Sequence, residues 1–214
     1  METNPINRKF AGSLATLAPH SYYPNTWETE RLFLRPFSAE DLTDLYRVYG
    51  NPEVMRFIDK TGKTLSETEA ELNSYIDHWK QHGFRNFAII HKASNTLIGR
   101  TGLYRNQRSP YPQFGYILDQ PYWGQGLAME AAKANLEYGF NILYFPVIAA
   151  FSMLENQASR KILSQKLGMQ LLTESFPYLG LKIAYYAIQR SQYLTNSLFS
   201  NFPSQPSSKR ERHD

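Results

Sequence analysis

The stretch YWGQGLAMEAAKANLEYGF, residues 122–140, decides which fold we expect for this chain. Gly124 and Gly126 stand directly before a helix-forming segment that begins near Leu127, and a strand-forming segment ends upstream near Asp119. This order leaves unpaired main-chain N–H groups at a helix start, where the helix dipole favours negative charge. Glycine permits a positive φ angle and close approach of a ligand. The segment predicts a phosphate site held mainly by main chain, although such a turn taken alone is more often purely structural.

Two common phosphate-binding motifs are absent from this segment. No Lys and Ser/Thr follow the glycines, as the G-x-x-x-x-G-K-[ST] pattern of nucleotide-binding loops requires. The G-x-G-x-x-G pattern of dinucleotide-binding turns also fails, because Met129 and Glu130 follow GQGLA. An NTP-binding loop is therefore not expected.

The flanking sequence predicts a mixed α/β fold in which helices cover a sheet. Alternation places Leu32 and Leu34 inward on a strand. Ser38 and Asp41, and Ser66 and Glu69, match helix capping boxes. The expected strands are 31–37, a hairpin within 85–105, 112–119, a buried strand in 145–154 and a closing strand in 181–190; the expected helices are 38–50, 66–83, 127–140 and 157–168, with glycine stops at Gly50, Gly83 and Gly168.

Length and composition favour one ordinary globular domain. The chain has 214 residues, 42% hydrophobic residues, a formal net charge of +4 and no cysteine. We expect an irregular N-terminal arm (1–27), a single domain (28–195) and a disordered Ser/Pro-rich tail (196–214). The absence of cysteine excludes disulfides and a catalytic thiol and is compatible with the cytoplasm, where we expect the protein. The scattered basic residues do not favour nucleic-acid binding, and no apolar run is long enough for a membrane helix.

The 122–140 segment resembles the acetyl-CoA-binding segment of the GCN5-related N-acetyltransferases (GNAT), and it is most similar to the RimJ/RimL ribosomal-protein N-acetyltransferase branch. The resemblance continues in TERLFLRPFSAEDL, NPEVMRFI, LIGRTGL and ENQASRKILSQKLGM, so five ordered segments cover about residues 27–190. It implies a central, mostly antiparallel twisted sheet of about seven strands and about four flanking helices. The fourth and fifth strands, FGYIL and IAAFSM, would splay apart around acetyl-CoA.

The resemblance also implies which residues bind the cofactor. The Q/R-x-x-G-x-G/A turn of the family corresponds here to Trp123, Gly124, Gln125, Gly126, Leu127 and Ala128, with Trp123 departing from the Q/R of the superfamily. Main-chain N–H groups of this turn would hold the pyrophosphate of coenzyme A. No metal is expected.

Amide formation from a thioester needs a neutral amine, a stabilised oxyanion and a proton for the leaving thiolate. The resemblance implies that Asn156 contacts the cofactor arm and that Ser159 protonates the sulfur, in a direct transfer without an acyl-enzyme. Both residues are also good helix caps, which is the structural alternative. The tyrosine that other GNAT members use as the acid corresponds to Ser164, a reserve candidate.

The sequence identifies no general base. Glu130 fits ordinary helix-surface pairing with Lys133 and Glu137. Asp119 is as consistent with a turn as with a catalytic role, and Glu155 with a solvated surface. The five histidines form no cluster in the sequence.

We therefore expect an acetyl-CoA-dependent N-acetyltransferase that acts on a primary amine, as a monomer or a homodimer. The resemblance suggests a protein N-terminus or a ribosomal protein as acceptor. A small-molecule amine, such as an antibiotic, a polyamine or an amino acid derivative, is the alternative. A non-catalytic acyl-CoA sensor or scaffold is a further hypothesis, and a nucleic-acid-binding module ranks last.

Overall fold

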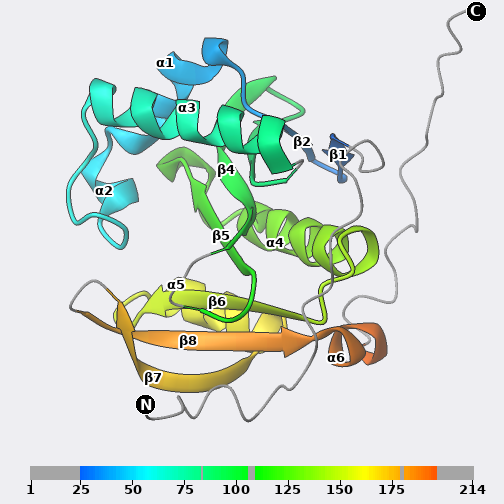
Figure 1. Cartoon of the computed structure of the whole chain (residues 1–214). Helices are drawn as coiled ribbons and strands as arrows, with labels where there is room; N and C mark the ends of the chain where they lie inside the picture. Colours follow the sequence, from blue (N-terminus) through cyan, green and yellow to red (C-terminus); the bar gives the residue numbers. More distant parts are fainter. Residues whose placement is uncertain (1–24, 83, 106–108, 179–180, 197–214) are drawn as a thin grey trace, which may run out of the picture.

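Eight strands form one open sheet in the order β1-β2-β3-β4-β5-β6-β8-β7 (Figure 1). The computed structural model describes residues 25–82, 84–105, 109–178 and 181–196. Neighbouring strands are antiparallel except for β5 and β6. The strands are β1 (Trp27–Glu28), β2 (Leu32–Arg35), β3 (Asn86–His91), β4 (Thr96–Tyr104), β5 (Gln113–Leu118), β6 (Val147–Met153), β7 (Gln170–Tyr178) and β8 (Leu181–Gln189).

The described residues form six α-helices, two more than expected, because the short α2 and α6 lack the length that reveals a helical period. Helices α1 and α3 lie on one side of the β1–β5 half, and α4 packs against β4 and β5 on the other (Figure 1). The helices are α1 (Leu42–Tyr49), α2 (Pro52–Met55), α3 (Leu65–His82), α4 (Leu127–Glu137), α5 (Gln157–Lys161) and α6 (Arg190–Thr195). One π-helical turn continues each of α4 and α5, at Tyr138–Ile142 and Ile162–Lys166.

The predicted splaying of two central strands is confirmed. β5 and β6 share a single parallel pair, Gln113 with Ala149, whereas β4 and β5 pair over six positions. Main-chain N–H of Ala149 donates to the carbonyl of Pro112 at 2.8 Å, which joins the strands at one end. Beyond Gln113, β5 therefore presents to β6 an edge without ladder pairing, and strand edges of this kind accept another extended chain.

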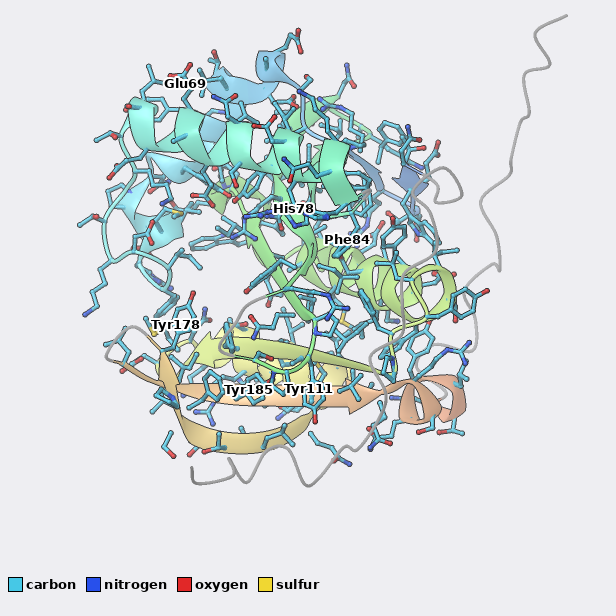
Figure 2. All side chains as sticks on the ribbon, in the orientation of Figure 1. Glu69, His78, Phe84, Tyr111, Tyr178 and Tyr185 are labelled. Carbon is cyan, nitrogen blue, oxygen red and sulfur yellow. The ribbon has the colours of Figure 1, made fainter. Side chains whose placement is uncertain are left out.

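The core consists of three clusters, the largest of which draws residues from both halves of the sheet. One large cluster lies between the sheet and α4, and a second lies under α1 and α3. The half of the sheet formed by β6, β7 and β8 also has an aromatic cluster, in which the rings of Phe176 and Tyr185 stack at 4.5 Å and Tyr111 packs beside them (Figure 2). The buried Leu32 and Leu34 confirm the alternation predicted for β2.

The capping predictions were right for one helix and wrong for the other. Main-chain N–H of Ser38 donates to the carboxylate of Asp41 at 2.8 Å, as predicted. In α3, however, the box is formed by Thr64 and Glu67, with Glu67 N–H donating to Thr64 Oγ1 at 3.2 Å. The S/T-x-x-E pattern occurs twice in TLSETE, and the earlier copy also brings Leu65 into the helix.

Two of the three predicted glycine stops can be compared with the structure. Gly168 has a left-handed φ of 65°, as a helix stop predicts. Gly50 follows α1 with a right-handed φ of −72°, so α1 ends there without the left-handed conformation. Gly83 and most of the predicted arm and tail lie outside the described residues, and the sheet begins at Trp27, the last residue of the predicted arm.

Candidate functional site

The glycine turn between β5 and α4 has the backbone conformation that its sequence predicts. Gly124 and Gly126 have φ angles of 75° and 79°, in the left-handed region that side chains disfavour. Gly126 is the N-cap residue of α4 and offers no side-chain cap. A Cβ at Gly124 would touch no atom within 4 Å, so packing inside the described protein does not require glycine there.

The main-chain N–H groups of this turn are available to a ligand. Within the described ranges, no hydrogen bond is donated by the N–H groups from Gly124 to Met129; the first bond into the helix runs from Glu130 N–H to the carbonyl of Gly126 at 3.1 Å. Unpaired N–H groups at a helix start, beside a left-handed glycine, form a concave surface that binds anions. The residues present therefore fit a phosphate group, without a basic side chain from the turn itself.

Side chains of the turn hold its shape. Trp123 Nε1 donates to the carbonyl of Leu118 at 2.8 Å, and Gln125 Nε2 donates to the carbonyl of Pro121 at 2.8 Å. Arg31 Nη1 donates to the carbonyl of Gln125 at 2.8 Å, which ties the turn to the loop before β2. The next two predicted cofactor residues begin α4 and belong to the core beneath it: Leu127 is fully buried in the large core cluster, and the partly buried Ala128 packs against that cluster.

Glu130 connects the turn to the first strands, and this replaces the pairing that the sequence predicts. Its carboxylate accepts from the main-chain N–H of Arg31 at 2.8 Å and from Arg31 Nε at 2.7 Å, and it also accepts from the Thr29 hydroxyl at 2.5 Å. Burial would raise the pKa of Glu130, but these hydrogen bonds outweigh it and lower the pKa below its ordinary value. The carboxylate is thus committed to holding the turn.

Glu137 also departs from the prediction of an exposed polar face. It is buried, and this burial raises the pKa of its carboxyl group above the ordinary value. Tyr193, on α6, lies near enough to Glu137 for the two side chains to interact electrostatically, so the C-terminal helix contributes to covering the side predicted to be solvated.

Asn156 and Ser159 lie together at the start of α5. Asn156 Oδ1 accepts from the main-chain N–H of Ser159 at 3.0 Å, so Asn156 is the N-cap of this helix. Asn156 therefore acts as the helix cap, which was the structural alternative. Capping uses its Oδ1 atom and does not involve its Nδ2 group. The catalytic role of these two residues stays a prediction.

The Ser159 hydroxyl has a hydrogen-bond partner, Tyr116, that the sequence did not identify as a candidate for the chemistry. Tyr116, on β5, directs its hydroxyl to Ser159 Oγ at 3.2 Å across the divergence of β5 and β6. Burial raises the pKa of Tyr116, so the phenol keeps its proton through neutral pH. Its place in FGYIL, on the strand expected to flank the thioester, was the available signal, but aromatic residues on strands are common in cores.

The remaining candidates have structural partners. Asp119 is buried and receives a hydrogen bond from Arg47, and its carbonyl accepts from Tyr122 N–H at 3.0 Å. Ser164 is exposed, and its hydroxyl donates to the carbonyl of Arg160 at 2.8 Å. Glu155 is exposed. None of these groups faces Ser159 through a hydrogen bond in the described part of the chain.

The described residues offer neither a cluster of metal ligands nor a helix that could cross a membrane. Within those ranges, no group of three or more His, Asp or Glu side chains is arranged to hold a metal ion. Nor does any helix there combine the length and the apolar character that crossing a lipid bilayer demands.

Comparison with known proteins gives a family match that includes this site. The model of the Acetyltransferase (GNAT) domain matches residues 31–170, which contain the glycine turn, Tyr116 and Ser159. An uncharacterized N-acetyltransferase, p20 of Bacillus licheniformis, is 33% identical over 65% of this chain and 79% of its own length. A spermidine N(1)-acetyltransferase of Escherichia coli is 30% identical over 51% of this chain and 58% of its own length.

Solved structures agree with the fold. A GNAT-family acetyltransferase from Bacillus anthracis superimposes with a TM-score of 0.67 at 26% identity, covering 78% of this chain and 99% of its own. A ribosomal-protein-S5-alanine acetyltransferase from Vibrio fischeri gives a TM-score of 0.65 at 18% identity, covering 78% and 98%, respectively. At that identity the second likeness concerns the fold alone.

Proposed function

This chain belongs to the GNAT family of acetyltransferases, and on that premise we propose that it transfers the acetyl group of acetyl-CoA to the nitrogen of a primary amine. The observation that carries the proposal is the run of unpaired main-chain N–H groups from Gly124 to Met129 at the start of α4. These groups would bind the pyrophosphate of coenzyme A, since an anion at a helix start is favoured both by direct hydrogen bonds and by the helix dipole.

The edge of β5 would hold the rest of the donor. Beyond Gln113 this edge has no ladder pairing with β6, so its main-chain groups can bind the amide groups of the pantetheine arm as they would bind a strand. When bound, the thioester supplies an activated acyl carbon. Tyr116 and Ser159 would then lie beside the reacting atoms, because both reach into the divergence from its two sides.

The chain's own contribution to the chemistry would be a proton at Ser159 Oγ. As the N–C bond forms and the C–S bond breaks, the departing thiolate needs a proton. Ser159 Oγ would donate it and take a proton in turn from the Tyr116 hydroxyl, which donates to that oxygen. Tyr116 would regain its proton from water, which receives the proton that the amine loses. Burial raises the pKa of Tyr116, so the phenol is protonated at the start of each turnover and its phenolate readily takes a proton back.

A carboxylate base is not required by this proposal. Glu130 and Asp119 are committed to Arg31 and Arg47, respectively. We therefore propose that the amine enters in its neutral form and that its second proton leaves to water after attack.

The acceptor amine can be a protein N-terminus or a small molecule, and different observations support each. The RimJ/RimL branch, and with it a protein N-terminus as acceptor, is supported only by the resemblance in sequence motifs. The spermidine acetyltransferase relative favours a small amine, but it is matched over 51% of this chain. A small-molecule amine is therefore kept as the second candidate acceptor, and a sensor without catalysis as the competing function.

Release of free coenzyme A thiol from acetyl-CoA tests the proposal. The panel of acceptors should contain amino acids, polyamines and peptides with free N-termini. We expect thiol release that depends on an amine and produces the acetylated amine in equal amount. Saturable acetyl-CoA binding, with no amine in the panel accelerating thiol release, would instead favour the sensor.

A further inference from the structure

A pair of arginines without a carboxylate partner lies under α1 and α3. Arg100 projects from β4, and Arg85 stands just before β3. Both guanidinium groups approach the ring of Tyr75, at 6.0 Å and 5.4 Å from its centroid. Within the described ranges, neither arginine forms an ion pair, and both side chains are only partly exposed. Two half-buried cations without an anion are costly unless a ligand supplies one.

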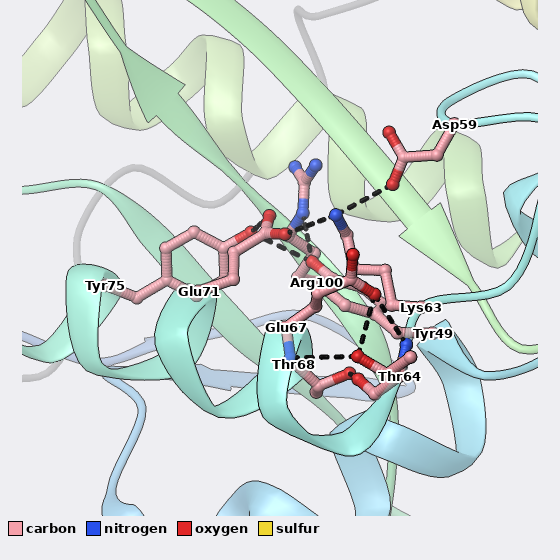
Figure 3. Close-up of polar contacts among 9 residues, drawn as sticks. All are labelled: Tyr49, Asp59, Lys63, Thr64, Glu67, Thr68, Glu71, Tyr75 and Arg100. Carbon is pink, nitrogen blue, oxygen red and sulfur yellow. Dashed lines mark hydrogen bonds and ion pairs between the residues drawn. The ribbon is translucent and has the colours of Figure 1, made fainter.

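The hydrogen bonds of Arg100 leave the outer end of its guanidinium free. Nε donates to the Tyr49 hydroxyl at 2.7 Å, and Nη1 reaches Asn86 Oδ1 at the long distance of 3.4 Å. No bond from Nη2 is found within the described chain. Figure 3 shows the two terminal nitrogens directed away from the other residues drawn. Such a fork matches the two oxygens of a carboxylate.

Arg85 has even fewer partners. Its Nε is buried and has no hydrogen-bond partner in the described part of the chain. A buried donor without a partner is uncommon in proteins, because desolvation is then not compensated. A ligand anion beside Arg100 would supply the missing acceptor.

The nearby carboxylate does not neutralise this pair. Glu71 accepts from the Tyr75 hydroxyl and from Lys63 Nζ at 3.2 Å, and Lys63 also pairs with Asp59 at 2.7 Å (Figure 3). Lys63 is thus shared by two carboxylates, and Glu71 also acts electrostatically on Arg100, where it raises the pKa of the guanidinium group. Three cations, Lys63, Arg85 and Arg100, are set against the two carboxylates Asp59 and Glu71, which leaves an excess of positive charge on the arginine side.

The position of Arg100 suits an acceptor that approaches β5 from the face opposite Tyr116. A Cβ built on Gly115 would lie 3.8 Å from Arg100 Nη1 and 3.7 Å from the ring of Tyr104. Consecutive strand residues point to opposite faces, so Gly115 faces the arginines while Tyr116 faces Ser159. A group bound at Arg100 is thus close to the strand edge where the transfer is proposed.

Tyrosines frame the same place from both halves of the sheet. Tyr104 belongs to β4, and Tyr178, at the end of β7, lies near enough to it for the two phenol groups to interact electrostatically (Figure 2). Burial raises the pKa of Tyr104 to about 12, so its hydroxyl is a hydrogen-bond donor at neutral pH. The surroundings therefore offer donors and positive charge, which suit an anion.

We propose that the acceptor is a primary amine that carries a carboxylate, and that Arg100 and Arg85 bind this carboxylate while the amine reaches the edge of β5. The inference rests on the acetyl transfer proposed above and specifies its acceptor class. Polyamines are disfavoured, because each extra ammonium group would meet the two guanidinium groups. The carboxylate can belong to a free amino acid or to an acidic residue at a peptide N-terminus.

Matched acceptor pairs test the class directly. Glycine, β-alanine and 4-aminobutanoate vary the spacing between the amine and the carboxylate, and their carboxamides lack the charge. A dipeptide that begins with aspartate, beside one that begins with asparagine, tests the peptide source. We expect kcat/KM to fall about 10- to 100-fold from the best carboxylate to its amide, the range of a lost charged hydrogen bond. Equal kcat/KM within every pair, or a preference for spermidine, would overturn the inference.

Variants connect the preference to the arginines. Arg85→Gln is the cleaner variant, because it breaks no hydrogen bond in the described chain. Arg85→Gln and Arg100→Gln should each raise KM for the carboxylate acceptor about 10-fold or more and leave KM for its amide unchanged. Arg100→Lys keeps the charge but loses the fork, so we expect only partial recovery. Lys80→Gln, an exposed charge loss on α3, is the control and should change neither value.

A binding measurement separates this inference from the proposed function. Titration calorimetry with N-acetyl-β-alanine and its amide, in the presence of coenzyme A, reports the carboxylate site without turnover. Carboxylate-dependent binding that is lost in Arg85→Gln supports the site even where no thiol is released, in which case acetyl transfer alone fails. Thiol release with every amine, together with equal binding of the acid and the amide, contradicts the carboxylate site and leaves acetyl transfer standing.

Discussion

The two sides of the proposed reaction are constructed in opposite ways. The proposed donor side is a continuous turn, Gly124–Met129, whose unpaired main-chain N–H groups would bind the donor. The acceptor side is formed by side chains from separate segments, with Arg85 before β3, Arg100 on β4 and Tyr178 on β7. A main-chain site tolerates many side chains and fails when one atom is added at a glycine. A side-chain site depends on each of its groups.

This contrast explains why the donor is easier to identify than the acceptor. A continuous turn has a sequence pattern, since it needs glycines directly before a helix. The arginine pair has none, because its members are 15 positions apart and belong to different segments. We therefore expect mutations at the turn to change acetyl-CoA affinity, and mutations that remove single side-chain groups to change acceptor binding or turnover.

The largest expected effect is the loss of the main-chain site in Gly126→Val. A branched side chain there would enter the space of the pyrophosphate, and we expect acetyl-CoA affinity to fall about 100-fold or more. Backbone strain at φ 79° adds about 1–3 kcal/mol of destabilisation. Calorimetric titration and thermal unfolding measure the two effects. Gly168→Val, at φ 65° beyond α5, is the control for lost stability, because a side chain there is strained and its Cβ would also lie 2.8 Å from Asn196 Nδ2; it should bind acetyl-CoA normally. Unchanged affinity in Gly126→Val would refute the phosphate site.

The next effect concerns the place where the two sides meet. Ser159→Ala and Tyr116→Phe should lower kcat about 10- to 100-fold, within the usual range for a positioned acid, with KM for acetyl-CoA nearly unchanged. Steady-state kinetics at pH 6–9 measure this. Because burial raises the pKa of Tyr116, no loss of rate from its ionisation is expected in that window. Ser164→Ala, which removes an exposed hydroxyl, is the matched control; wild-type turnover in Ser159→Ala would remove this residue from the mechanism.

A smaller effect should follow from Tyr49→Phe under α1. The variant removes the acceptor of Arg100 Nε and the 2.9 Å partner of the Tyr75 hydroxyl, both largely enclosed. The Tyr75 hydroxyl keeps Glu71 as its acceptor, but Arg100 Nε loses its acceptor, and leaving such a group unpaired costs about 1–3 kcal/mol. Chemical denaturation measures the loss in free energy of unfolding. Tyr46→Phe, on the exposed side of the same helix, should lie within about 0.5 kcal/mol of wild type; similar losses in both would argue against the network.

The smallest effect tests whether the main-chain site also depends on a side chain. Glu130→Gln should raise KM for acetyl-CoA several-fold, because Arg31 loses its ion pair and holds the carbonyl of Gln125 less firmly. The folded pKa of Glu130 is lowered, so its stabilisation is present above the ordinary pKa and is lost as pH falls through the folded value. The difference in melting temperature between wild type and variant should therefore shrink from pH 7 towards pH 3. A difference that stays constant with pH would exclude the ion pair as its cause.

Much of the fold could be predicted because it follows from local patterns. The alternation at Leu32 and Leu34 and the Ser38–Asp41 box depend on neighbouring residues, and each was found as predicted. The box of α3 was misplaced because TLSETE contains two overlapping signals; the structure uses the earlier one, at Thr64, whose carbonyl also accepts from the hydroxyl of the buried Thr68. Glu137 was misplaced for a related reason, since helical period alone does not show which elements cover a helix.

The sequence by itself determined the mixed α/β fold and the glycine turn, because hydrophobic period and left-handed glycines act within a few residues. The splaying of β5 and β6 was expected only from the resemblance to the GNAT family. Only the tertiary structure decided that Tyr116 meets Ser159, that Glu130 binds Arg31 and that Arg85 and Arg100 share the ring of Tyr75. These contacts join positions far apart in the chain. Their chemistry depends on burial and charge, which arise only when the sheet and its helices are assembled.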